Sequence, residues 1–182
     1  MDPGDAGGGM HWYVMRDLKR ANAKEPAYKR LEKEGFEVFT PMRTVLAVRQ
    51  GRRIREKVPF IRDLLFVRAM RNGLDPVVEK TPTLQYRYLR GGAYRDPMTV
   101  PDSEMERFIR VVNASDSPRY YLPEEIDAKM CGRKVRIVGG ALDGCEGNLL
   151  AMRGTRVRRL LVELQGFLIV GVEVRPEYVR FL

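Results

Sequence analysis

A run of four consecutive apolar residues, Leu64-Leu65-Phe66-Val67, constrains the fold of this chain more than any other feature. Neighbouring side chains of a strand point to opposite faces of a sheet, so this run suits a strand that is buried on both faces. The segments around it alternate between strand-like and helix-like patterns. Strands are expected at 11–15, 36–39, 45–58 and 85–90, and helices at 21–34, 74–80 and 102–112. This order predicts an α/β sandwich in which helices pack on a small sheet.

The segment from Arg43 to Val58 is predicted to be a long basic β-hairpin with its turn at Gln50-Gly51. Its cations are Arg43, Arg49, Arg52, Arg53, Arg55 and Lys57, and its single acid is Glu56. Arginine is suited to phosphate contacts because its guanidinium group can donate two parallel hydrogen bonds. A solvated hairpin also uses charge to prevent edge-to-edge pairing, so this pattern leaves both roles open.

The second half of the chain has a different pattern. Residues 114–129 have no clear period and are predicted to be a linker. From residue 130 onward, glycines and polar residues separate short strand-like runs, which predicts a small all-β barrel. These runs are 135–138, 147–152, 159–164, 166–174 and 178–182. Residues 1–10 are small, acidic and glycine-rich, and we expect a disordered tail there.

Composition favours one kind of partner and excludes several classes of protein. The net charge of +9 favours polyanionic partners, because its long-range field attracts them. No apolar run approaches the roughly 20 residues that span a bilayer, so no membrane association is expected. Cys131 and Cys145 have no metal-ligand spacing and His11 is the only histidine, which predicts no metal and reduced thiols in a cytoplasmic protein. Without a nucleotide-binding glycine loop or a Ser/His/Asp set, neither an enzyme nor a cofactor is expected.

Both halves resemble one known family. Trp12-Tyr13-Val14, the segment 36–41 and the segment 60–67 resemble, in order and spacing, the N-terminal (NGN) domain of NusG-type transcription factors. The last fifty or so residues resemble a KOW motif, through 135–137, 140–144 and Gly147. The resemblance implies an α+β protein with an NGN α/β sandwich and an SH3-like KOW barrel. Its parts would be a tail at 1–10, the NGN domain at 11–113, a linker at 114–129 and the KOW domain at 130–182.

The segment from Tyr86 to Val112 is most similar to specialised members of this family. These are the RfaH-like factors and the antiterminators encoded at the head of capsular-polysaccharide operons. The chain departs from the family pattern in two places. It has Arg62-Asp63 where the family usually has Pro-Gly or Pro-Asn, and Ala141 where a proline usually follows the KOW glycine.

The resemblance implies a monomeric transcription elongation and antitermination factor. Its NGN domain would bind the clamp helices of RNA polymerase and suppress pausing and termination, close to upstream or non-template DNA. Its KOW domain would recruit a ribosomal protein or a termination factor. The positions that match the family's polymerase-binding hollow are Phe60, Ile61, Leu64 and Tyr88. An alternative for Phe60 and Leu64 is ordinary core packing.

Two basic clusters complete the expected sites. The nucleic-acid-binding residues of the hairpin are Arg49, Arg52, Arg53, Arg55 and Lys57. The partner-binding residues of the barrel are Arg153, Arg156, Arg158 and Arg159, for which a solvated loop is the alternative. A different function also fits the same motifs, because KOW sequences occur in ribosome-associated proteins that read RNA directly.

Overall fold

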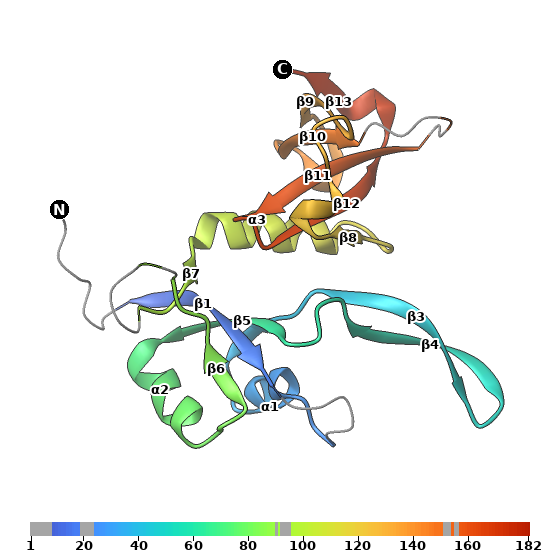
Figure 1. The fold of residues 1–182 in the computed structure, drawn as a ribbon. Helices are drawn as coiled ribbons and strands as arrows, with labels where there is room; N and C mark the ends of the chain where they lie inside the picture. Colours follow the sequence, from blue (N-terminus) through green and yellow to red (C-terminus); the bar gives the residue numbers. More distant parts are fainter. Residues whose placement is uncertain (1–8, 19–23, 90, 92–95, 151–153, 155–156) are drawn as a thin grey trace, which may run out of the picture. The chain divides into compact units, whose positions relative to one another are not determined.

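A computed structural model describes residues 9–18, 24–89, 91, 96–150, 154 and 157–182 (Figure 1). Contacts divide the chain into two compact units, residues 1–102 and residues 103–182. The division therefore falls at the start of the helix that we expected to close the first domain at residue 113. The expected tail lies outside the described residues as far as residue 8, and the first strand already begins at Met10.

The first unit contains an antiparallel sheet with the strand order β2-β5-β1-β6, in which β7 also pairs with β1. Its strands are β1 (Met10–Asp17), β2 (Glu37–Phe39), β5 (Leu64–Met70), β6 (Leu84–Tyr86) and β7 (Thr99–Val100). Its helices are α1 (Ala27–Lys33) and α2 (Arg71–Glu79). Strands β3 (Met42–Arg49) and β4 (Arg52–Pro59) form a separate two-stranded ribbon. The predicted hairpin is confirmed as this ribbon.

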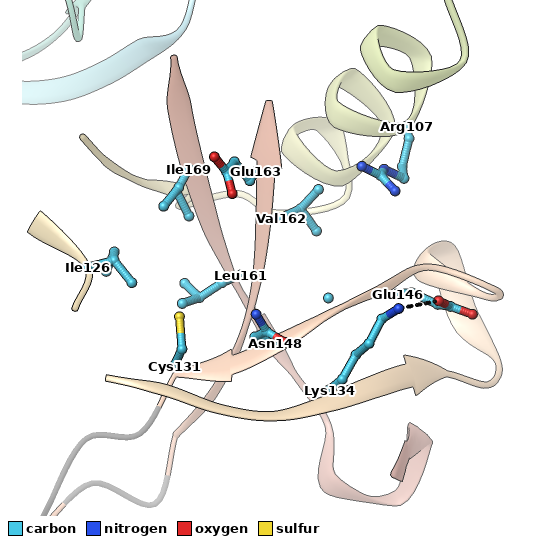
Figure 2. A pocket seen from close by; sticks show the side chains of 11 residues that line it. Arg107, Ile126, Cys131, Lys134, Glu146, Asn148, Leu161, Val162, Glu163 and Ile169 are labelled. Atoms are coloured by element: carbon cyan, nitrogen blue, oxygen red, sulfur yellow. Dashed lines mark ion pairs between the residues drawn. The ribbon is translucent and has the colours of Figure 1, made fainter. Parts of the chain in front are cut away.

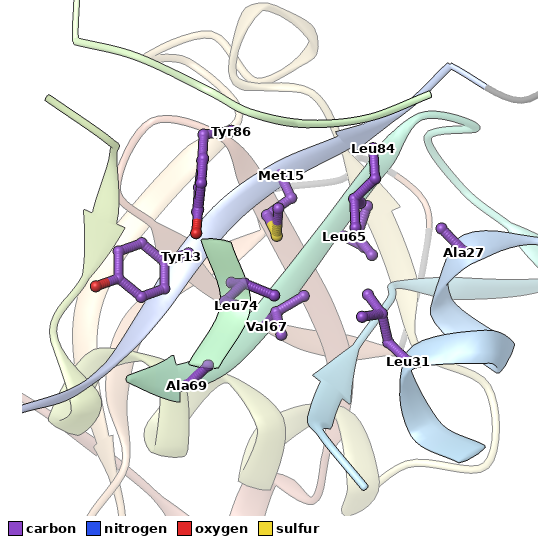
Figure 3. Close-up of a cluster of buried hydrophobic side chains, with 10 residues drawn as sticks. All are labelled: Tyr13, Met15, Ala27, Leu31, Leu65, Val67, Ala69, Leu74, Leu84 and Tyr86. Carbon is purple, nitrogen blue, oxygen red and sulfur yellow. The ribbon is translucent and has the colours of Figure 1, made fainter. Parts of the chain in front are cut away.

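Strand β5 is buried on both of its faces, as its apolar run predicted. One face of the sheet and the two helices form the core cluster that Figure 3 shows, with Leu65 and Val67 from β5, Leu31 from α1 and Leu74 from α2. Side chains at alternate positions, such as Phe66, point to the opposite face and are buried as well. The run therefore specifies a strand with apolar surroundings on both sides.

Helix α1 is shorter than the sequence predicted, because it begins at Ala27 instead of Ala21. Pro26 occupies the N-cap position in an extended conformation, and the carboxylate of Asp17 accepts a hydrogen bond from the Ala27 N–H at 2.8 Å. The end of β1 thus caps a helix ten residues further along the chain. Gly35 follows the helix with a φ of 89°, as a glycine that ends a helix commonly does. Residues 21–23 lie outside the described part of the chain.

The second unit carries helix α3 and an antiparallel sheet with the strand order β13-β9-β10-β11-β12-β8. Its elements are α3 (Asp102–Asn113), β8 (Arg119–Tyr121), β9 (Cys131–Ile137), β10 (Glu146–Leu150), β11 (Arg158–Leu164), β12 (Leu168–Val174) and β13 (Val179–Phe181). Short 3-10 turns lie at Pro123–Glu125, Gly140–Leu142 and Pro176–Tyr178. Among the helices within the described residues, none has the length and apolar character needed to cross a membrane.

The segment 114–129, expected to be a linker, contains an ordered strand. Strand β8 pairs with β12, so that Tyr120 lies opposite Val170 and is buried. The sequence shows no periodicity there because β8 has only three residues, and its partner lies about fifty residues further along the chain. The segment expected to be a linker therefore belongs to the second unit, in which β8 forms an edge strand.

Tyr86 offers a test of the first unit's core. Its hydroxyl donates a 2.8 Å hydrogen bond to Asp75, and its burial and this bond raise the pKa of Tyr86 above the usual range. The folded state thus holds the phenol proton more tightly than the unfolded state does. This contribution to stability is complete below about pH 10 and is lost as the pH rises further.

We expect Tyr86→Phe to lower the free energy of unfolding by about 1 kcal/mol at neutral pH, because the ring remains and only the hydrogen bond is lost. The variant should also lose less stability than the parent protein between about pH 9 and pH 11. Urea unfolding at a series of pH values measures both effects. Parallel pH profiles for the two proteins would contradict the proposed role of the hydroxyl.

Candidate functional site

The β3–β4 ribbon presents the basic residues of the first unit. Gln50 and Gly51 form its two-residue turn with φ angles of 49° and 74°. Two successive positive φ angles are typical of the type I′ turn, whose twist matches that of the flanking strands. This turn sets the register, with Arg49 opposite Arg52 and Met42 opposite Pro59. Figure 1 shows the ribbon extending away from the sheet of the first unit.

The register divides the expected nucleic-acid-binding residues between two faces of the ribbon, because directly opposed residues point to the same side. One face, called here the Leu46 face, carries Leu46, Val48, Arg53, Arg55 and Lys57. The other, called the Arg49 face, carries Arg49, Arg52, Ala47, Ile54, Val45, Glu56, Arg43 and Val58. The five cations that the sequence grouped together therefore do not form a single surface.

The two faces differ in how their charges are used. On the Arg49 face, Arg49 forms an ion pair with Glu56 at 3.2 Å, and the Arg43 guanidinium lies 5.8 Å from the centre of the Phe60 ring. On the Leu46 face, the three cations make no ion pair with any described residue. Leu46 and Val48 lie opposite Arg55 and Arg53 and are 72% and 68% exposed. Within the described part of the chain, this face therefore combines cations that form no ion pair with exposed aliphatic surface.

The loop between β4 and β5 carries two of the expected polymerase-binding residues, Phe60 and Ile61, both half-buried. The Phe60 N–H donates to the Pro41 carbonyl at 2.8 Å, which closes the base of the ribbon. The Ile61 carbonyl accepts a hydrogen bond from the N–H of Leu64. Both residues thus lie where the ribbon joins the sheet.

Asp63 holds this loop against strand β1. Its carbonyl accepts a 2.9 Å hydrogen bond from the Asp17 N–H, and its carboxylate accepts one from the Arg16 Nε at 2.9 Å. The Arg87 guanidinium lies 3.9 Å from the same carboxylate oxygen. The acidic residue that departs from the family pattern therefore links the loop to strand β1 and to Arg87, which directly follows β6.

The other two expected polymerase-binding residues lie elsewhere. Leu64 is 2% exposed, so the structure places it in the core and not on an open surface. Tyr88 is 47% exposed and follows β6, with its ring 6.4 Å from that of Tyr86 and its backbone bridged to Pro97. Strand β1 lies between β5, which follows the β4–β5 loop, and β6, which precedes Tyr88.

The basic cluster of the second unit is only partly described. Arg153 and Arg156 lie outside the described residues. Arg158 is exposed at the start of β11, whereas Arg159 is buried and forms a 2.8 Å ion pair with Glu173 on β12. Arg159 therefore joins two strands. The sequence led us to expect a partner-binding role for this residue, but its side chain is buried and already paired.

A cleft of about 240 Å³ lies in the second unit (Figure 2). Its lining includes Arg107, Lys134, Glu146, Leu161 and Ile169. The Arg136 guanidinium donates to Glu146 at 2.9 Å and the Lys134 ammonium lies 3.4 Å from it. These bonds, that from Arg136 above all, lower the pKa of Glu146. Among the charged residues that line this cleft, Lys134 and Glu146 are therefore paired with each other.

The structure adds residues that the sequence did not nominate. Leu46 and Val48 were expected only as strand residues, and Asp63 only as a departure from the family pattern. The first two could have been found from the two-residue turn, because the turn fixes which residues face each other across the ribbon. The contacts of Asp63 depend on strands far away in the sequence and carry no local signal.

Comparison with known proteins places the chain in a family. The family model described as transcription termination factor nusG matches residues 10–109. The matched segment contains the whole sheet of the first unit, the β3–β4 ribbon and the β4–β5 loop. No curated protein matches the chain.

Proposed function

The chain belongs to the NusG family of transcription elongation and antitermination factors, and we propose that it binds RNA polymerase through its first unit. Proteins of this family generally bind RNA polymerase. The observation that carries the proposal is the position of Phe60 and Ile61, two half-buried apolar residues at the base of the ribbon within the matched segment. Apolar side chains left accessible to solvent beside a rigid sheet are typical of a partner-binding surface.

The partner surface on the polymerase is its pair of clamp helices. A helical pair presents an apolar ridge that Phe60 and Ile61 can contact from the β4–β5 loop. Asp63 keeps this loop in place through Arg16 and the backbone of Asp17. Bound in this position, the first unit holds the clamp closed, and pausing and termination are suppressed. The ribbon then contacts the upstream or non-template DNA.

The second unit acts as a KOW module that recruits a further partner, a ribosomal protein or a termination factor. Its antiparallel sheet and its glycine-containing turns support this assignment. A module tethered to the polymerase-bound unit meets its partner at a raised effective concentration. Within the family, the chain is a specialised antiterminator of the kind encoded in capsular-polysaccharide operons.

Sequencing of the nascent RNA that co-purifies with the tagged full chain tests the proposed function. We expect RNA polymerase subunits and nascent transcripts in the purified material, with transcripts from one operon enriched at least about tenfold over the rest if the factor is specialised. Even recovery of all transcripts would indicate a general elongation factor. Recovery of ribosomal RNA that survives high salt, without polymerase subunits, would instead indicate a ribosome-associated protein and would contradict the proposal.

A further inference from the structure

We infer that the Leu46 face of the β3–β4 ribbon binds the major groove of duplex DNA, whereas the Arg49 face does not. The inference deepens the proposed function, because it names the form of nucleic acid and the side of the ribbon that meets it. It rests on the pairing register, on exposure and on charge.

The Leu46 face consists of two parallel columns of side chains. Strand β4 provides a cationic column, Arg53, Arg55 and Lys57, and strand β3 provides an aliphatic column, Leu46 and Val48. Alternate residues of a strand lie about 6.8 Å apart, and directly opposed residues lie about 5 Å apart. The cations therefore follow a line at intervals similar to the distance between successive phosphates along one DNA strand.

These columns match one side of a DNA groove. The cationic column can follow the phosphates of one DNA strand, while the side chains of the aliphatic column point into the groove next to that strand. The major groove of B-form DNA is about 12 Å wide, which admits a two-stranded ribbon. Its floor carries the C5-methyl group of thymine, an apolar partner for Leu46 and Val48. Contact with thymine methyl groups would therefore explain why Leu46 and Val48 are exposed, whereas exposed aliphatic side chains do nothing for the solubility of the protein.

Other nucleic acids fit this face less well. Proteins that bind single strands stack the bases on aromatic side chains, and residues 42–59 contain no aromatic residue. Double-stranded RNA has a major groove that is too narrow and deep for side chains to read. An acidic protein surface would satisfy the cations but would leave the aliphatic column unexplained. Duplex DNA is therefore the ligand that uses both columns.

The Arg49 face provides a matched control on the same two strands. It has its own pair of exposed arginines, Arg49 and Arg52, so Arg49→Gln/Arg52→Gln removes the same charge as Arg53→Gln/Arg55→Gln. Arg49 already pairs with Glu56, and the exposed aliphatic residue of this face, Ile54, lies on β4 between Arg52 and Glu56. No column of cations therefore stands beside an aliphatic column on this side. The two double variants therefore change the ribbon's net charge equally on opposite faces, and Arg49→Gln/Arg52→Gln additionally breaks the ion pair with Glu56.

Fluorescence anisotropy of the full chain with an A·T-rich duplex, without polymerase, measures the effect. We expect Arg53→Gln/Arg55→Gln to weaken binding at least about tenfold and to reduce the log-log salt slope by about two. We expect Arg49→Gln/Arg52→Gln to weaken it less than about threefold, through the long-range field alone. Equal effects of the two variants would overturn the inference, as would tighter binding to the single strand or to double-stranded RNA of the same sequence.

A second measurement tests the aliphatic column. Leu46→Ser/Val48→Ser should weaken binding about tenfold without changing the salt slope, because no phosphate contact is lost. A duplex with deoxyuridine in place of thymidine lacks the methyl groups, and we expect it to bind the parent protein more weakly and this variant no differently. An equal loss in both proteins on removal of the methyl groups would place the aliphatic column outside the groove and overturn the inference.

These results are independent of polymerase binding. The DNA assays contain no polymerase, and the polymerase-binding residues Phe60 and Ile61 remain unchanged in every ribbon variant. If the two faces behave alike while replacement of Ile61 by serine strongly weakens polymerase binding, the inference about the ribbon fails and the proposed function stands. Circular dichroism of each variant checks that the fold is retained.

Discussion

Replacing Ile61 by serine is expected to raise the dissociation constant for RNA polymerase elongation complexes by at least about a hundredfold. The side chain is half-buried in the β4–β5 loop, where it combines apolar surface with access to solvent. A polar group at the centre of a partner-binding surface must be desolvated without gaining a hydrogen bond, which makes the loss large. Biolayer interferometry with immobilised elongation complexes measures the change, and Phe60→Ala should behave in the same way.

The control for this experiment separates binding from folding. Because Ile61 is only half-buried, we expect the free energy of unfolding of Ile61→Ser to fall by no more than about 1.5 kcal/mol. Val138→Ser replaces an exposed aliphatic residue of the second unit and should bind polymerase as the parent protein does. A large decrease in melting temperature for Ile61→Ser would identify Ile61 as a core residue. Equal losses of binding in the Ile61 and Val138 variants would contradict docking through the first unit.

The second large effect is expected at Gly147, in strand β10. A β-carbon added there would lie 2.2 Å from the Leu161 carbonyl oxygen and 3.0 Å from the Leu160 Cδ1 atom. Strand β11 would therefore have to move away from β10. This movement would disturb the pairing of the two strands, because Asn148, next to the glycine, lies directly opposite Leu161. We expect Gly147→Ala to lower the free energy of unfolding by about 3 kcal/mol or more, because the clash involves backbone that cannot change rotamer. Urea unfolding monitored by circular dichroism measures this loss.

Gly73 provides the opposite case for the same substitution. It lies inside helix α2, and a β-carbon there would meet no described atom within 4 Å. Gly73→Ala should therefore raise the stability of the first unit by up to about 1 kcal/mol, since alanine has less freedom to lose in a helix. The fluorescence of Trp12, the only tryptophan, reports this transition. A similar loss of stability at Gly147 and Gly73 would show that the close approach of β11 is not the cause.

Features that depend on neighbouring residues could be predicted from the sequence. Gln50-Gly51 predicted the turn of the ribbon, because glycine adopts the positive φ of a tight turn without steric cost. That Gln50 adopts a positive φ as well could not be predicted, since glutamine has no preference for that conformation. The apolar run at β5 predicted burial on both faces, since side chains alternate along any strand. The motifs between Trp12 and Val67 predicted the family, which the match over residues 10–109 confirmed.

The expected sites were less accurate, because a site depends on which face a side chain occupies. Grouping by composition placed Arg52 and Arg53 in one cluster, yet neighbouring residues of a strand point to opposite faces of the ribbon. The polymerase-binding set grouped Leu64 with Phe60 and Ile61, although Leu64 begins the buried strand. The hairpin cations were grouped by proximity in the chain, whereas Leu64 was included through the family resemblance with core packing as the alternative, and its burial favours that alternative.

Local chemistry, read along the chain, thus specified the strands, the turn of the ribbon and the family to which the protein belongs. Packing in three dimensions was needed to pair Arg159 with Glu173, to add β8 to the edge of β12 and to hold the β4–β5 loop through Asp63 and Arg16. The physical reason is the range of the interactions. A turn or an alternating strand depends on residues within a few positions, whereas an ion pair or a strand edge depends on a partner that only the folded chain brings near.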